Sequence, residues 1–76
     1  MTGNLPVVLC VDDDPRTLEI LSKIMSRLPV MCVTARTPRE ALDLARRLRP
    51  QLLVLDLMLP EMSGWEVLEQ IRSEAA

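Results

Sequence analysis

The fold is decided by the stretch Leu52-Leu53-Val54-Leu55-Asp56-Leu57-Met58-Leu59-Pro60-Glu61-Met62-Ser63-Gly64, in which an apolar run meets a single carboxylate and then a loop. Packing gives no reason to end a buried strand in an aspartate, because a desolvated carboxylate costs free energy. Asp56 is therefore either a turn or cap residue, since aspartate is common in turns, or a functional residue. Residues elsewhere in the chain are needed to choose between these two interpretations of Asp56.

The composition indicates one small domain with an aliphatic core. The chain has 76 residues, and a chain this short buries only about 60–65% of its unfolded surface. Hydrophobic residues make up 49% of it, with one Trp and no Phe or Tyr, so the core must consist of Leu, Val, Ile and Met. The net charge is -2, and the arginines at positions 46, 47 and 49 lack interleaved aromatic residues. The segment is therefore not expected to bind nucleic acid.

The apolar segments and cysteines bear on where the protein works. No apolar run approaches the roughly 18 residues of a membrane span, and the chain does not open with a signal-peptide pattern. Cys10 and Cys32 each lie inside an apolar run, and no Cys or His spacing suits a metal ion. Buried free thiols in a reducing compartment are favoured over a disulfide. The expected location is the cytoplasm, without membrane contact.

Three strand–helix units of similar length follow one another. Apolar runs predict strands at about residues 7–12, 30–34 and 51–56. An Asp14-Pro15 start and capping boxes beginning at Thr37 and Ser63 predict helices at about residues 15–28, 38–48 and 64–74. Strands that alternate with helices pair in parallel through right-handed crossovers, so the predicted fold class is α/β with a parallel sheet.

Helical spacing also predicts which side chains are buried. In the first helix one apolar face is expected to hold Leu18, Leu21, Met25 and Leu28, with Ile20 and Ile24 beside it. In the last helix Val67, Leu68 and Ile71 are expected to face the core. Trp65 is expected to be a packing residue at the start of that helix.

Carboxylates follow two of the predicted strands. Asp12 and Asp13 come after the first strand, and Asp56 comes after the third. Function in an open parallel sheet gathers at the carboxyl ends of the strands, so these side chains converge if the two strands are neighbours. Two unit charges about 4 Å apart repel by about 4 kcal/mol at an effective dielectric constant near 20, so the cluster calls for raised pKa values or a bound cation. Oxygen ligands favour Mg²⁺ over zinc, and a carboxylate beside Mg²⁺ can attack a phosphoryl donor.

On these residues the chain resembles, over essentially its whole length, the receiver domain of response regulators in two-component signalling. The resemblance rests on Asp12-Asp13 after the first strand and on the run from Asp56 to Gly64. It implies a flavodoxin-like sheet in the strand order 2-1-3, a truncated (βα)3 half of a receiver. It also implies a phosphoryl group on Asp56, donated by a sensor histidine kinase, and no enzymatic activity. The implied ligands of Mg²⁺ are Asp12, Asp13, Asp56 and the backbone carbonyl of Met58.

Plain structural roles remain for several of these acids. Asp14 is expected to be only a helix cap and is excluded from the site. Asp12 and Asp13 could be solvated turn residues, and Glu61 a solvated loop acid.

The chain departs from the family in its length. Receiver domains resemble five strand–helix units, and the family's hydroxyl residue after the fourth strand and lysine after the fifth have no counterpart in these 76 residues. The only lysine, Lys23, lies in the first predicted helix. Phosphorylation is therefore expected to be impaired. The third strand would be an apolar edge, and such edges pair with other chains, so a homodimer through this edge or through exchange of elements is expected.

Two other functions stay open. One is an assembly module that is not phosphorylated and keeps a vestigial acidic pocket. The other is a phosphatase of the haloacid-dehalogenase type, because Asp12-Asp13-Asp14 contains an Asp-x-Asp motif after a strand. Against it, Arg16 stands where that family has Thr or Val, and the chain lacks room for the downstream catalytic residues.

Overall fold

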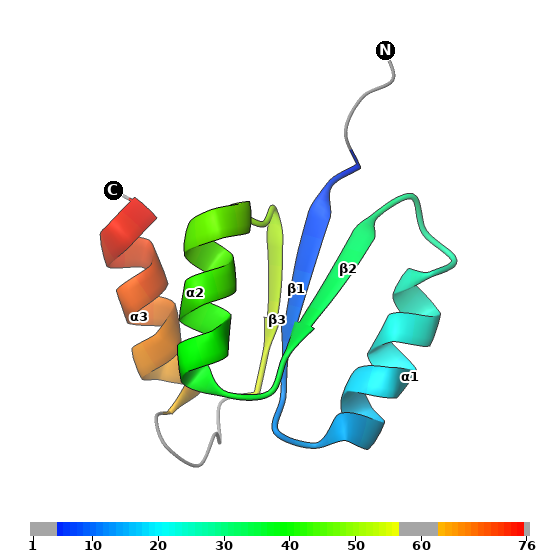
Figure 1. Cartoon of the computed structure of the whole chain (residues 1–76), viewed down its shortest axis with the longest axis horizontal. Coiled ribbons are helices and arrows are strands. Elements are labelled where there is room, and N and C mark those ends of the chain that lie inside the picture. Colours follow the sequence, from blue (N-terminus) through cyan, green and yellow to red (C-terminus); the bar gives the residue numbers. More distant parts are fainter. Residues whose placement is uncertain (1–4, 57–62, 76) are drawn as a thin grey trace.

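Three parallel strands form the centre of the molecule. The structure, a computed structural model, describes residues 5–56 and 63–75. Its elements are β1 (Val7–Val11), α1 (Pro15–Met25), β2 (Met31–Ala35), α2 (Pro38–Leu48), β3 (Leu52–Leu55) and α3 (Gly64–Ala75) (Figure 1). The strands form one sheet in the order β2-β1-β3. This confirms the predicted α/β class and strand order.

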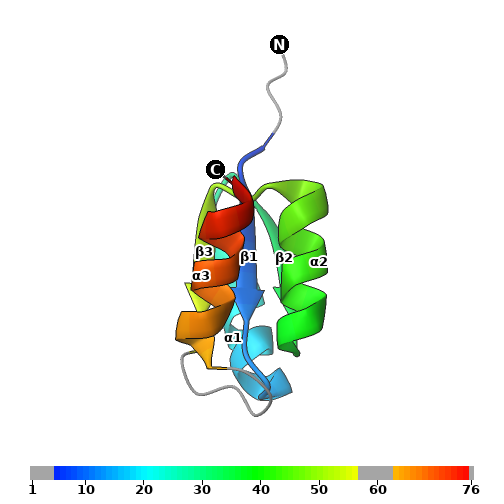
Figure 2. The same ribbon diagram turned by 90° about the vertical axis from the view of Figure 1, so that its left-hand side faces the viewer.

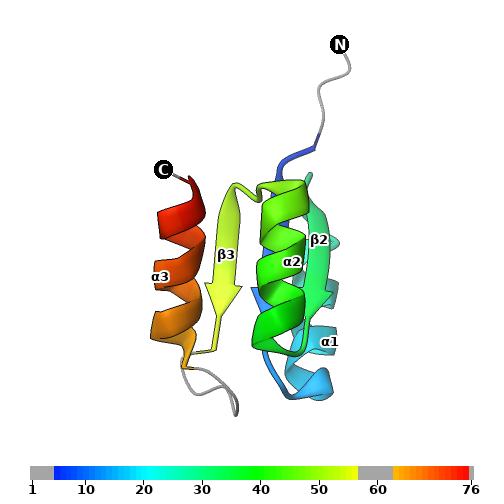
Figure 3. The ribbon, with the colours of Figure 1, turned by 60° about the vertical axis from the view of Figure 1, so that its left-hand side comes forward.

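The helices cover both faces of the sheet. α1 lies on one face, and α2 and α3 lie side by side on the other (Figures 2 and 3). The side chains of β1 alternate between these faces. Leu9 and Val11 pack on the side of α2 and α3, whereas Val8 and Cys10 pack under α1. All four are at most 3% exposed, which explains why β1 reads as an unbroken apolar run.

A side chain caps the start of each helix by accepting a hydrogen bond from a backbone N–H. Asp14 caps α1, its Oδ1 accepting from the Arg16 N–H at 2.9 Å. Thr37 caps α2, its Oγ1 accepting from the Glu40 N–H at 3.1 Å. Ser63 accepts from the Glu66 N–H at 3.2 Å at the start of α3. These bonds satisfy amide groups that have no partner inside a helix.

α1 ends at Met25, earlier than the expected end near residue 28. The N–H groups of Arg27 and Leu28 donate to carbonyls three residues back, at 3.2 and 3.0 Å, so the chain forms tight turns here and leaves the α-helix. Leu28 consequently leaves the predicted apolar face and is 51% exposed. Ile20 and Ile24 are also exposed.

The other element bounds differ from the expected ones by at most one residue. β2 begins after Val30, because the Val30 N–H donates to the Leu28 carbonyl at 2.8 Å and still belongs to the turn. Differences of this size are usual at the ends of elements.

The core is aliphatic, as the composition requires. The larger cluster of buried residues lies between the sheet and the helices α2 and α3, and consists of Leu9, Val11, Ala35, Ala41, Leu42, Ala45 and Val67. The prediction that Trp65 packs was wrong, since it is 64% exposed. Val67 is buried in this turn of α3, and Trp65 lies about 200° around the helix from it and therefore faces solvent.

Candidate metal centre

The carboxylates of Asp12, Asp13 and Asp56 meet at one edge of the sheet. β1 and β3 are hydrogen-bonded neighbours, and both point their carboxyl ends to this edge. One carboxylate oxygen from each of the three residues lies within 4.8 Å of the others. The structure thus brings together the three acids on which the sequence interpretation depended.

The backbone of the sheet sets the positions of two of these acids. The Asp12 N–H donates to the Ala35 carbonyl at the end of β2, at 3.1 Å. The Asp56 N–H donates to the Val11 carbonyl at the end of β1, at 3.0 Å. Both residues therefore extend the hydrogen-bonding of the sheet by one step, and both are half-buried. Asp13, on the loop, is exposed.

The loop after β1 is also held by its own side chains. The Asp14 N–H donates to Oδ1 of Asp12 at 2.9 Å, which orients that carboxylate. Asp14 itself caps α1, as expected, and is not part of the acidic cluster. The backbone N–H of Arg16 donates to the Asp14 carboxylate and lowers the pKa of that group.

One residue of this region was missed by the sequence interpretation. Arg36 directly follows β2, and its guanidinium donates to the Asp13 carbonyl at 3.4 Å. Its own backbone N–H donates to Oε1 of Glu40 in α2, at 2.8 Å. The available signal was a cation two residues after a predicted strand, at the same edge as the acids.

The donor set suits a small divalent cation. At a separation of about 4.8 Å, two carboxylates repel by about 3 kcal/mol at an effective dielectric constant near 20. A cation between them offsets this repulsion. Ligand oxygens of an octahedral Mg²⁺ lie about 3–4 Å apart, a spacing close to that of the three carboxylate oxygens. The exposed side of Asp13 leaves room for the water molecules that Mg²⁺ retains.

Part of the predicted site belongs to the segment that follows Asp56. Met58, Pro60 and Glu61 fall outside the described residues. Gly64, the last residue of the run that begins at Asp56, is the first residue of α3. Thr34 is a half-buried residue within β2, opposite Cys10.

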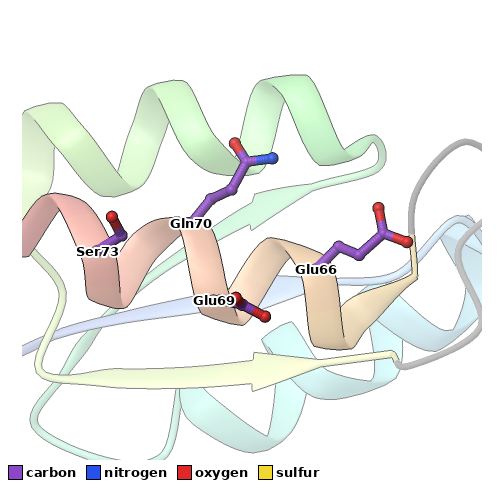
Figure 4. A pocket seen from close by; sticks show the side chains of 4 residues that line it. All are labelled: Glu66, Glu69, Gln70 and Ser73. Carbon is purple, nitrogen blue, oxygen red and sulfur yellow. The ribbon is translucent and has the colours of Figure 1, made fainter.

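Two hollows lie away from the acidic cluster. One, of about 370 Å³, runs along α3 and is lined by Glu66, Glu69, Gln70 and Ser73. Figure 4 shows these four side chains leaving a single helix in different directions, so they do not converge on one point. The other, of about 330 Å³, is lined by apolar residues of α2, β3 and α3 together with Arg46, Arg49 and Pro50. Neither hollow is lined by Asp12, Asp13 or Asp56.

The helices of the described segments do not reach the length and apolar character needed to span a membrane. Both cysteines are free thiols, Cys10 buried and Cys32 half-buried, with their sulfur atoms 3.9 Å apart under α1. Burial and the neighbouring Cys32 raise the pKa of Cys10 to about 11.

Comparison with known proteins shows which family this chain matches. The model of the response regulator receiver domain family matches residues 8–76. The probable transcriptional regulatory protein TcrX of Mycobacterium tuberculosis is 43% identical over 72 residues, which are 95% of this chain and 31% of that protein.

Solved structures give the same result. The signal receiver domain of a putative Luxo repressor protein from Vibrio parahaemolyticus has a TM-score of 0.89 and 33% identity, over 95% of this chain and 55% of that one. The response regulator TrrA from Thermotoga maritima, in complex with Mg²⁺ and BeF, has a TM-score of 0.86 and 31% identity, over 92% of this chain and 61% of that one. The chain thus spans less than two thirds of each of these relatives.

Proposed function

Because this chain belongs to the response regulator receiver domain family, we propose that it is a phosphoacceptor module of a two-component signalling system. Receiver domains are phosphorylated by histidine kinases, and the proposed donor is a sensor histidine kinase. The observation that carries the proposal is the convergence of Asp12, Asp13 and Asp56 within 4.8 Å at the carboxyl edge of the sheet.

In this proposal Asp56 is the acceptor. A carboxylate oxygen of Asp56 attacks the phosphorus of a phosphohistidine, the P–N bond to the imidazole breaks, and an acyl phosphate forms on Asp56. The half-buried position of Asp56 and its backbone bond to Val11 support this role, because they hold the nucleophile at a fixed point on the sheet.

Asp12 and Asp13 are the proposed Mg²⁺ ligands, together with Asp56 and the backbone carbonyl of Met58. The bound ion would neutralise negative charge that develops during transfer. Asp12 receives a hydrogen bond on one carboxylate oxygen from the Asp14 N–H, so its orientation is set before the ion arrives. The Mg²⁺–BeF complex of the Thermotoga relative supports this assignment by similarity.

A small phosphodonor tests the proposal. The chain is incubated with an acyl phosphate and Mg²⁺, and its intact mass is measured before and after acid or base treatment. We expect one phosphoryl group on the wild type, none on Asp56→Asn, and less on Asp12→Asn. Undiminished phosphorylation of Asp56→Asn would contradict the assignment. So would amide spectra of Asp12, Asp13 and Asp56 that do not change when Mg²⁺ is added.

The remaining assignments follow from the same proposal. The segment is proposed to catalyse no turnover of its own and to bind neither nucleic acid nor membrane. Its free thiols Cys10 and Cys32 support a reducing compartment, for which we propose the cytoplasm. The family match sets aside the phosphatase interpretation of Asp12-Asp13-Asp14.

A second candidate function is assembly. In the described part of the chain β3 pairs with β1 only, and Leu52 is 52% exposed at its start. An apolar strand with one open edge favours the addition of another strand. In this alternative the chain is an assembly module that is not phosphorylated and keeps a vestigial acidic pocket. For either function we propose a homodimer formed through the β3 edge or through exchange of elements. A folded monomer in sedimentation equilibrium at tens of micromolar would refute it, and a dimer indifferent to Mg²⁺ and to Asp56→Asn would favour assembly over signalling.

A further inference from the structure

Arg36 is a charged residue next to the acidic cluster that the proposed chemistry does not use. It follows β2 at the carboxyl edge of the sheet, and its guanidinium donates to the Asp13 carbonyl at 3.4 Å. A residue's carbonyl oxygen and its own carboxylate are only a few bonds apart, so the guanidinium lies within about 8 Å of the Asp13 carboxylate. Its charge therefore acts on a divalent-ion site.

The backbone of Arg36 is held in place from α2. Its N–H donates to the Glu40 carboxylate at 2.8 Å, and the Glu40 N–H in turn donates to the Thr37 hydroxyl at 3.1 Å. The start of α2 thus directs the Arg36 side chain toward the loop after β1. The base of the side chain is fixed, whereas the guanidinium at its end is exposed and makes a long hydrogen bond to the Asp13 carbonyl.

We propose that Arg36 sets the affinity of the acidic site for divalent cations, because its positive charge near Asp13 competes with the charge of the bound cation. This inference rests on the proposed function. Without a metal, the guanidinium relieves part of the repulsion among the three carboxylates. When a divalent cation binds, the two positive charges repel each other, and the ion binds less tightly than it would without Arg36.

The charge of Arg36 affects ion binding more than its hydrogen bond to the Asp13 carbonyl does. A hydrogen bond of 3.4 Å to an exposed carbonyl is weak, so its loss changes the loop little. Removing a unit positive charge about 8 Å from a divalent ion in water strengthens ion binding about fivefold. At 0.15 M ionic strength the Debye length is about 8 Å, so the effect falls to about twofold.

Three variants of the full chain test this, with Mg²⁺ binding measured by titration calorimetry at low and at physiological ionic strength. Arg36→Gln removes the charge and keeps an N–H donor. Arg36→Lys keeps the charge and loses the planar guanidinium. Arg27→Gln is the matched control, because it removes the same charge in the turns after α1, at the opposite end of the sheet.

We expect Arg36→Gln to lower the Kd for Mg²⁺ about fivefold at low salt and about twofold at physiological salt. Arg36→Lys and Arg27→Gln should remain at the wild-type value. An unchanged or higher Kd in Arg36→Gln overturns the inference, as does equal tightening in Arg27→Gln, which would reflect net charge alone. If the wild type binds Mg²⁺ and only the Arg36 result fails, the proposed function stands; if the wild type does not bind Mg²⁺, both fail.

Discussion

Replacing Asp56 with Asn should make the metal-free protein more stable while removing the proposed phosphoryl acceptor. In the wild type each pair of carboxylates in the cluster lies within 4.8 Å. At that distance two unit charges repel by about 0.9 kcal/mol even at the dielectric constant of water. Asp56 takes part in two such pairs, and asparagine occupies nearly the same volume without the charge. We therefore expect the free energy of unfolding to rise by about 1–1.5 kcal/mol at low ionic strength.

Chemical denaturation in chelator and in saturating Mg²⁺ measures this effect. A gain of 1 kcal/mol corresponds to roughly 4–8 °C in Tm for a domain of this size, so a thermal melt resolves it as well. In Mg²⁺ the difference between variant and wild type should shrink or reverse, because the wild type gains more from binding the ion. Glu69→Gln, on the exposed surface of α3, removes one negative charge outside the cluster and serves as the control.

Two results would refute this reasoning. A variant less stable than the wild type in chelator would show that repulsion within the cluster is not the dominant effect of the Asp56 carboxylate on stability. Equal stabilisation by Mg²⁺ in both proteins would show that Asp56 contributes nothing to the ion site. Glu69→Gln should stay within about 0.5 kcal/mol of the wild type in both conditions.

Three further predictions concern the scaffold. Val67→Ala should lower the free energy of unfolding by about 2 kcal/mol, because the Val67 side chain is fully buried (0% exposed). Trp65→Ala should change it by less than about 0.5 kcal/mol, because Trp65 is 64% exposed. The urea midpoints of the two variants distinguish these outcomes. Thr37→Ala should cost about 1 kcal/mol by removing the cap of α2, and Thr37→Ser should restore it, as thermal melts would show. Because burial raises the pKa of Cys10 above its ordinary value of 9.0 to about 11, its contribution to stability is complete below pH 9 and declines as the pH rises toward 11. Alkylation at pH 8 should accordingly modify half-buried Cys32 before Cys10, and equal rates in the native protein would contradict the buried assignment.

The sequence was most informative where one local pattern decides the outcome. The apolar run from Val7 to Val11 predicts a buried strand, and β1 is that strand, covered on both faces. Caps at Asp14 and Thr37 predict helix starts because the bonds involved span only two or three residues. The strand order came from the family resemblance, since periodicity alone does not say which strands are neighbours.

The failures have tertiary causes. Trp65 is apolar and lies one position from the helix start, yet the face of α3 that meets the sheet is chosen by Val67 and Ile71. Leu28 continues the helical spacing of α1, but the turns that lead to β2 take it out of the helix. Arg36 contacts a carbonyl 23 residues away in sequence, a contact that depends on the pairing of β1 with β2. Each case required knowledge of a neighbour that no local pattern supplies.

The acidic site and the stability of the sheet depend on the same hydrogen bonds. The Asp12 N–H bonds to the last residue of β2 and the Asp56 N–H to the last residue of β1, so the acids that follow β1 and β3 are tied to the ends of the neighbouring strands. Repulsion among the carboxylates destabilises the strand pairing at the carboxyl edge of the sheet. A bound cation replaces this repulsion with attraction and stabilises the pairing. A ligand that binds only the folded state stabilises it by RT ln(1 + [L]/Kd). Occupancy of the site should therefore be measurable as stability of the carboxyl edge, most directly as slower amide hydrogen exchange at Asp12 and Asp56 in Mg²⁺ than in chelator.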